Sequence, residues 1–166
     1  MSHIIYIIGV AGSGKTTIGK LLSLKTGLPF FDGDDFHPAE NKEKMKAGHP
    51  LTDEDRQQWL QQLNKLAIDK SKLKGAIIAC SALKEKYRIV LGSGITTPAW
   101  IFLQGNYELI HERMKKRKGH FMPAQLLQSQ FDNLEIPASA LMVDIKKESD
   151  KIVEIIMQYL NDRQPS

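Results

Sequence analysis

The side chains best suited to chemistry lie near the start of the chain, in a glycine-rich segment. Residues 9–16 read G-V-A-G-S-G-K-T and match the pattern G-x-x-x-x-G-K-[ST] in full. An apolar run precedes the segment and a run of helical period follows it, which is the context that this phosphate-binding loop requires. In such a loop, glycine lets backbone N–H groups approach phosphate oxygens. The lysine reaches the β- and γ-phosphates, and the threonine hydroxyl ligates the metal.

The segment therefore predicts binding of ATP with Mg²⁺. An ordinary glycine turn that happens to hold a lysine is the alternative, and the flanking strand and helix argue against it. The expected nucleotide ligands are Gly9, Val10, Ala11, Gly12, Ser13, Gly14, Lys15 and Thr16, of which Lys15 is also catalytic and Thr16 also binds the metal.

Acidic side chains follow the second apolar run. Residues 30–38 read F-F-D-G-D-D-F-H-P, so three carboxylates occur within four residues. Asp32 and Asp34 project to the same side if the extended backbone of the strand continues through them. One carboxylate can then hold a magnesium-bound water while the other accepts the proton of an attacking hydroxyl. The alternative is a solvated acidic turn in which Asp34 or Asp35 caps the next segment.

Basic side chains follow the third apolar run, where residues 80–88 read C-S-A-L-K-E-K-Y-R. Lys84 and Arg88 are one helical turn apart and can face the site together, or they can form a solvated helix face. Many enzymes with this loop end this strand in an aspartate that assists Mg²⁺. Because Cys80 stands there instead, that role passes to Asp32 or to water. Cys80 is the only cysteine, and we expect it to be a small buried residue rather than a nucleophile.

The densest basic run is residues 113–118, R-M-K-K-R-K. Arg113 and Arg117 are four residues apart and share one face of a helix. Gly119, His120 and Phe121 follow them as a possible hinge and tip. We therefore expect a mobile lid that brings arginine to the transferring phosphoryl group and excludes water. A basic surface helix is the alternative.

Composition limits the class of protein. The chain has 166 residues, of which 42% are hydrophobic and 25% charged, as in an ordinary globular domain. The net charge of +4 suits a partner that carries phosphate, either a nucleotide or a nucleic acid. One cysteine permits no internal disulfide, and no apolar stretch approaches the ~18 residues of a membrane span. We expect no signal peptide, because the apolar run Ile4–Ile8 has no basic segment before it and passes straight into the glycine-rich loop. We expect a cytoplasmic protein without a membrane partner.

The elements that must position these residues alternate between short apolar runs and longer helical segments, which predicts an α/β fold with a five-stranded parallel sheet between two helical layers. The predicted strands are Ile4–Ile8, Pro29–Asp32, Ala76–Cys80, Ala99–Gln104 and Ala140–Ile145. The predicted helices are Gly14–Thr26, Asp53–Lys72, Tyr107–Lys116, Ala124–Asn133 and Ser149–Leu160. We expect one domain over residues 1–166. Extra helical material at the carboxyl ends of parallel strands is where ligands bind, so we assign residues 36–74 to substrate and residues 113–133 to the lid.

Several of these segments together resemble the gluconate kinases, small P-loop kinases related to the shikimate and nucleoside monophosphate kinases. The resemblance rests on the segments 9–16, 31–38, 41–56 with W-L at 59–60, 80–88 and 117–135, which cover the chain nearly end to end. The loop at 9–16 is generic among P-loop proteins, whereas the other segments are specific to the family.

The resemblance implies transfer of the ATP γ-phosphoryl group to the 6-hydroxyl of D-gluconate, in a homodimer. In the related shikimate kinases the first aspartate of D-x-D serves magnesium and the second serves the substrate hydroxyl. Here these would be Asp32, as a metal ligand, and Asp34, as a catalytic and substrate-binding residue. Arg56 falls near the arginine that binds the carboxylate of the substrate in that family. The other expected ligands are His37, Lys84, Arg88 and His120 for the substrate and Arg113 for the nucleotide, with Arg117 catalytic.

Three alternatives stay open. Adenylyl-sulfate kinases share D-G-D after the second strand, but His37-Pro38 and the segment C-S-A-L-K disfavour them. Shikimate kinases usually carry a glycine triplet after the third strand, where this chain has Ser81-Ala82-Leu83. An ATP-gated nucleic-acid-binding protein would use the basic run, yet no aromatic residues interleave with Lys115–Lys118 as stacking platforms.

Overall fold

The fold is built on a central sheet of parallel strands. The structure is a computed structural model that describes residues 3–117 and 122–164. The sheet has five strands in the order β2-β3-β1-β4-β5. The strands are β1 His3–Ile8, β2 Phe30–Asp32, β3 Gly75–Cys80, β4 Ala99–Gln104 and β5 Leu141–Asp144. The predicted α/β class and the five-stranded parallel sheet are confirmed. No strand end differs from the prediction by more than one residue, and half of the ends agree with it.

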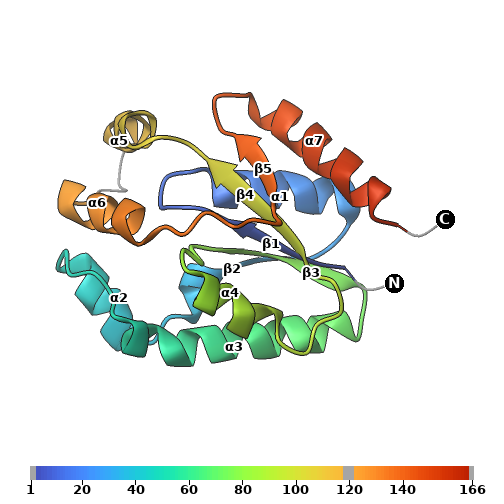
Figure 1. The fold of residues 1–166 in the computed structure, drawn as a ribbon, viewed down its shortest axis with the longest axis horizontal. Helices are drawn as coiled ribbons and strands as arrows, with labels where there is room; N and C mark the ends of the chain where they lie inside the picture. The colour runs from blue at the N-terminus through green and yellow to red at the C-terminus, as the bar shows by residue number, and fades with distance from the viewer. Residues whose placement is uncertain (1–2, 118–121, 165–166) are drawn as a thin grey trace.

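Helices cover both faces of the sheet, as Figure 1 shows. The helices are α1 Lys15–Thr26, the 3₁₀ helix η1 Gly33–Phe36, α2 Ala39–Lys46, α3 Asp53–Ser71, α4 Glu85–Gly92, α5 Tyr107–Lys116, α6 Ala124–Asn133 and α7 Ser149–Asp162. Helices α1 and α7 lie on one face and α3 and α4 on the other, while α2, α5 and α6 gather at the end of the molecule away from both termini (Figure 1). None of the helices in the described ranges is long and apolar enough to span a membrane.

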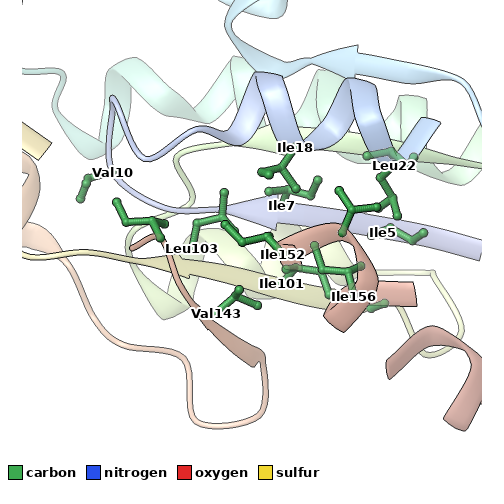
Figure 2. Packing of buried hydrophobic residues seen from close by; sticks show 14 of the residues in the cluster. Ile5, Ile7, Val10, Ile18, Leu22, Ile101, Leu103, Val143, Ile152 and Ile156 are labelled. Atoms are coloured by element: carbon green, nitrogen blue, oxygen red, sulfur yellow. The ribbon is translucent and has the colours of Figure 1, made fainter. Parts of the chain in front are cut away.

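Strand β1 supplies side chains to two hydrophobic cores, because successive residues of a strand point to opposite faces of the sheet. Ile5 and Ile7 pack with α1 and α7 in one core, where Ile18, Leu22 and Ile152 surround them (Figure 2). The remaining apolar side chains of β1 pack on the other face against α3 and α4. With both faces covered, β1 reads as a continuous apolar run rather than an alternating one.

The start of α3 is fixed by a reciprocal capping box. The Thr52 hydroxyl accepts a hydrogen bond from the Asp55 backbone N–H at 3.1 Å, and the Asp55 carboxylate accepts one from the Thr52 N–H at 2.9 Å. These bonds satisfy two backbone N–H groups that the first helical turn would leave unpaired. They also set the position of Arg56, which lies in this first turn.

Trp59 ties α3 to the turn that follows β2. Its side chain is fully buried, its indole Nε1 donates a hydrogen bond to the Gly33 carbonyl at 2.7 Å, and its ring stacks on His37 with centroids 4.4 Å apart. One side chain therefore holds both the acidic turn and His37 against the helical layer.

We predict that Trp59→Phe lowers the free energy of unfolding by about 1–3 kcal/mol, because the Gly33 carbonyl then stays buried without its donor. Urea denaturation followed by circular dichroism measures this. Trp100→Phe is the matched control, since Trp100 is partly exposed and stacks on Tyr6. Equal losses in both variants would mean that ring size alone, and not the bond to Gly33, accounts for the effect.

Candidate active site

The glycine-rich loop connects β1 to α1 and curves around the amino end of that helix. Gly12 has φ +76 and Gly14 has φ +95, a left-handed backbone that side chains disfavour. A Cβ on Gly12 would also lie 2.8 Å from Met114 of α5, so only glycine fits there. The Lys15 ammonium donates to the Gly9 and Val10 carbonyls at 2.9 Å each. Burial lowers the pKa of Lys15, and the charge of Asp34 opposes that shift.

A cavity of about 620 Å³ opens beside this loop. Its walls come from the glycine-rich loop, from the end of α5 and from the segment after β5. Arg113 donates to the Ile145 carbonyl at 2.6 Å and so joins α5 to that segment. The lining residues are Gly12, Ser13, Gly14, Thr17, Ile18, Arg113, Lys116, Arg117, Ile145, Lys146, Lys147, Glu148, Ser149 and Ile152. The cavity offers backbone N–H groups, a helix amino end and five basic side chains, which suit a nucleotide with its phosphates.

Asp32 links the end of β2 to the glycine-rich loop. Its Oδ2 accepts a hydrogen bond from the Thr16 hydroxyl at 3.1 Å, and its Oδ1 accepts one from the Asp34 backbone N–H at 3.0 Å. The Thr16 oxygen keeps its lone pairs free, so a hydroxyl and a carboxylate lie together beside the phosphate cradle. Oxygen donors of this kind, with phosphate and water completing the shell, fit Mg²⁺.

The expectation that Asp32 and Asp34 continue an extended strand is wrong. Asp32 caps the 3₁₀ helix η1, so the backbone turns at Gly33 instead of continuing. The two side chains nevertheless reach a common cavity of about 470 Å³, which Lys15, Thr16 and Arg117 also line. The turn brings them together because Gly33 passes directly over the end of β3, where a Cβ would lie 2.6 Å from the Ala79 carbonyl oxygen.

Asp34 lies where two cavities meet. It lines both the 470 Å³ cavity and a smaller cavity of about 80 Å³. Partial withdrawal from water raises the pKa of Asp34, and the charge of Lys15 acts in the opposite direction. A carboxylate whose pKa is raised toward neutrality is better able to take up a proton.

The smaller cavity extends from the glycine-rich loop between α3 and α6. It shares Ala11, Lys15 and Asp34 with the cavity that lies at the phosphate side. Its lining residues are Ala11, Lys15, Asp34, His37, Met45, Pro50, Leu51, Arg56, Ser81, Leu83, Met122, Leu126, Ser129, Gln130 and Asn133. Polar groups from five separate segments thus converge on one side of the catalytic loop, as expected of a pocket for a small polar molecule.

His37 is neutral in this pocket, and its neighbours determine which ring nitrogen carries the proton. The Asn41 amide nitrogen donates to the Asp55 carbonyl at 2.7 Å, which fixes the orientation of the amide. The same nitrogen lies 3.3 Å from His37 Nδ1, so Nδ1 must accept and the proton resides on Nε2. Burial, with Arg56 and Lys42 nearby, lowers the pKa of His37 to about 4. The Nε2–H of His37 is therefore available as a hydrogen-bond donor for a ligand of this pocket.

Arg56 faces the same pocket from the first turn of α3. Its guanidinium lies 5.4 Å from the centre of the Tyr87 ring, a cation–π contact. Its Nε is buried and has no hydrogen-bond partner among the described residues. A guanidinium with an unused donor inside a pocket is suited to an anion such as a carboxylate.

Two predicted substrate ligands, Lys84 and Arg88, lie outside the residues that line this pocket. Lys84 forms an ion pair with Asp53 at 3.1 Å and does not line the pocket. Arg88 is 5% exposed, and its guanidinium donates to the Ala82 and Glu135 carbonyls at 2.8 Å each. Because Arg88 lies on the buried face of α4, it joins this helix to the segment after α6 and takes no part in the pocket.

The basic run divides between α5 and the residue that ends it. Helix α5 ends at Lys116 as predicted, and Arg117 adopts extended backbone as its C-cap, so Arg117 does not share a helix face with Arg113. Arg113 and Arg117 nevertheless both line the 620 Å³ cavity beside the glycine-rich loop, which is the nucleotide cavity below. Arg117 also lines the 470 Å³ cavity that Asp32 and Asp34 share. His120, a predicted substrate ligand, lies outside the described residues.

Cys80 ends β3 beneath the acidic turn, as expected of a small buried residue. It is 1% exposed, and burial raises the pKa of its thiol to about 12. The strand end therefore contributes no carboxylate, and among the described residues no cluster of three or more His, Cys, Asp or Glu side chains could hold a metal. The oxygens of Thr16 and Asp32 are left as the protein ligands that fit Mg²⁺.

Sequence reasoning missed several residues that build the site. Gln130 on α6 accepts a hydrogen bond from the Ala11 backbone N–H at 2.7 Å, and Asn41 fixes the His37 ring. Both lie in segments that resemble the gluconate kinases, but no spacing rule assigns a role to a lone amide. The segment after β5, which lines the nucleotide cavity, carries no motif at all.

Comparisons with known proteins agree with this geometry. A family model described as shikimate kinase matches residues 11–161. A probable gluconokinase from Xenopus tropicalis is 42% identical, over 92% of this chain and 90% of that protein. The thermoresistant gluconokinase of Escherichia coli (strain K12) is 40% identical, over 95% of this chain and 93% of its own. The crystal structure of a gluconokinase from Sinorhizobium meliloti 1021 matches with a TM-score of 0.86 and 35% identity, covering 98% of both chains.

The relatives thus align with this chain over nearly its whole length, from the glycine-rich loop to the last helix. The protein belongs to the gluconokinase family, within the wider group of P-loop kinases that the shikimate kinase model describes.

Proposed function

We propose that this protein transfers the γ-phosphoryl group of ATP to the 6-hydroxyl of D-gluconate, giving 6-phospho-D-gluconate and ADP. The relatives named above support the reaction. The observation that carries it is the pocket in which Arg56 and neutral His37 lie beside Asp34 and Lys15. A carboxylate-binding group and a hydroxyl-binding group on one side of a catalytic loop suit a polyhydroxy acid.

The nucleotide and its metal ion would occupy the two larger cavities, of about 620 and 470 Å³, beside the glycine-rich loop. The glycine-rich loop, residues 9–16, would hold the phosphates, and Arg113 would lie along the nucleotide. Mg²⁺ would be held by Thr16 and Asp32, directly or through water, and when bound it neutralises charge on the phosphates. The hydrogen bond from Thr16 to Asp32 keeps both oxygens oriented for this before the nucleotide arrives.

The transfer itself depends on three side chains. Asp34 orients the substrate hydroxyl and takes its proton, a role to which its raised pKa is suited. Lys15 leaves the Gly9 and Val10 carbonyls to contact the phosphates, and Arg117 supplies a second positive group. In a loose phosphoryl-transfer transition state, most of the rate enhancement comes from such charge and positioning.

Substrate recognition is assigned to the inner end of the pocket. The Arg56 guanidinium, which has an unused Nε donor, binds the carboxylate, and His37 Nε2–H donates to a hydroxyl. The helical segment 36–74 then forms the substrate-binding region, and the segment 113–133 acts as the lid over both ligands. Lys84 and Arg88 are left out because their donors are used within the fold.

The proposal extends to the cellular location, the oligomeric state and the partners of the protein. We assign the protein to the cytoplasm, where ATP is available, and we expect a homodimer with no nucleic-acid partner. Light scattering of the purified protein tests the dimer. An oligonucleotide shift that weakens with salt would instead support the nucleic-acid alternative.

A coupled assay of ADP release tests the function. Gluconate, shikimate, adenylyl sulfate and nucleoside monophosphates are each supplied with ATP and Mg²⁺, and Lys15→Ala serves as the inactive control. We expect turnover with gluconate well above that with the other acceptors. Turnover that favours shikimate or adenylyl sulfate would overturn the proposal.

Asp34→Asn should lower kcat far more than it raises KM for gluconate. The amide keeps a hydrogen bond to the hydroxyl but cannot take its proton, a role worth about 10²–10⁴-fold. We expect the lower end of that range because the transition state is loose. Steady-state kinetics decide the point, and a change confined to KM would show that Asp34 only positions the substrate.

Arg117→Ala should lower kcat by about 10²–10³-fold, the usual cost of removing one donor to the transferring group. Arg117→Lys should restore only part of this, because an ammonium cannot bridge two phosphate oxygens as a guanidinium does. Lys115→Ala is the control, since Lys115 is exposed and pairs with Glu112.

We also expect an ATP analogue to slow trypsin cleavage within the basic run 113–118. Equal cleavage rates with and without the analogue would contradict the assignment of this segment to a lid.

The lowered pKa of His37 predicts a loss of stability in acid. The ordinary pKa is 6.5 and the folded pKa is about 4, so the unfolded chain binds the proton first. The contribution is fully present above pH 6.5 and disappears as the pH falls toward 4. Between pH 7 and pH 5 the loss from this residue is about 2 kcal/mol.

Urea denaturation at both pH values measures this loss, with His37→Gln as the variant that cannot titrate. The wild type should lose more stability than the variant by about 2 kcal/mol. Identical pH dependence in both proteins would mean that His37 titrates normally in the fold.

A further inference from the structure

Gln130 is positioned between the substrate pocket and the phosphate-binding loop. It comes from the last half of α6, far along the chain from the loop, and its Oε1 accepts the Ala11 backbone N–H at 2.7 Å. Ala11 lines both the substrate pocket and the cavity at the phosphate side. Gln130 itself lines the substrate pocket only.

This hydrogen bond determines what Gln130 presents to the pocket. A backbone N–H can only donate, so the amide oxygen of Gln130 must face Ala11. The amide NH₂ group must then point the other way, and the residue is only partly exposed, at the pocket wall. Because Gln130 lines this pocket, its NH₂ group is available to donate to a molecule that occupies it.

The position of Ala11 indicates which end of the ligand these donors meet. Ala11 and Asp34 both lie where the two cavities join, so the phosphoryl acceptor must lie beside them. Arg56 is on the other helical wall, and it is absent from the residues that line the phosphate-side cavity. The Gln130 donors therefore meet the hydroxyl end of a hydroxy acid rather than its carboxylate.

We infer that Gln130 is a substrate-binding residue of this kinase. Its Nε2 donates to a hydroxyl oxygen next to the phosphoryl acceptor, while Ala11 N–H holds its Oε1. This assignment rests on the proposed function and adds a ligand to it. It also explains why a helix of the lid segment is tied to the phosphate-binding loop: the same side chain aligns the acceptor with the phosphates.

Substitution by glutamate separates this role from a purely structural one. Gln130→Glu keeps an oxygen that can accept from Ala11 N–H, but it has no donor and places a negative charge near the phosphates and the acid. Gln130→Met has a similar shape and loses both functions. Gln125→Glu is the matched control, because Gln125 is exposed on the same helix and undergoes the same change of charge.

Steady-state kinetics are measured on each variant with ATP and with whichever acid of the panel the wild type phosphorylates. Wild-type turnover of gluconate tests the proposed function by itself, before any variant is compared. Both Gln130 variants should lower kcat/KM for the acid about tenfold or more, the usual cost of a lost hydrogen bond in a polar pocket. KM for ATP should change by less than about twofold, and Gln125→Glu should behave as the wild type.

The opposite results overturn the inference. Wild-type kinetics in Gln130→Glu, with loss only in Gln130→Met, would show that Gln130 merely joins α6 to the loop. An equal rise of KM for ATP and for the acid would show an effect of charge on the nucleotide. Thermal unfolding of every variant is compared with the wild type, and a loss of kcat/KM accompanied by partial unfolding at the assay temperature would count against a binding role.

Discussion

Asp32 joins two strands of the sheet that are not neighbours, and the geometry of the site depends on that contact. Strand β3 lies between β1, which leads into the glycine-rich loop, and β2, which ends at Asp32. The acidic turn must cross the end of β3 before its carboxylate can meet Thr16. The crossing is possible because Gly33 has no side chain, since a Cβ there would lie 2.9 Å from Cys80 Cβ. Small residues at this crossing thus set the distance between the phosphates and the acidic groups.

The pocket next to this crossing is assembled from segments far apart in the sequence. Trp59 holds the turn against α3, and Asn41 connects α2 to the carbonyl of Asp55. These contacts leave neutral His37 and the Arg56 guanidinium on one wall. This wall is therefore fixed before any ligand binds, which lowers the ordering cost of binding.

Much of the fold could be predicted because its signals are local. The continuous apolar run of β1 and the pattern of residues 9–16 identified the strand, loop and helix with nearly correct bounds. The turn at Gly33 was only the alternative to an extended backbone, because nothing in the local sequence shows that β3 will lie beneath it. Arg88 was assigned to the substrate from helical spacing, yet spacing does not tell which face of α4 is buried. Gln130 and Asn41 were missed because their partners are backbone atoms of distant segments.

The burial of Cys80 has a consequence for the reactivity of the protein. The thiolate is the form that attacks electrophiles and peroxides. With the pKa of the thiol near 12, only about one molecule in 10⁵ carries a thiolate at neutral pH, and the side chain is 1% exposed. Since Cys80 is the sole cysteine, alkylating agents that attack thiolates find no reactive sulfhydryl beside the phosphate-binding loop, so we expect them to leave phosphoryl transfer unchanged.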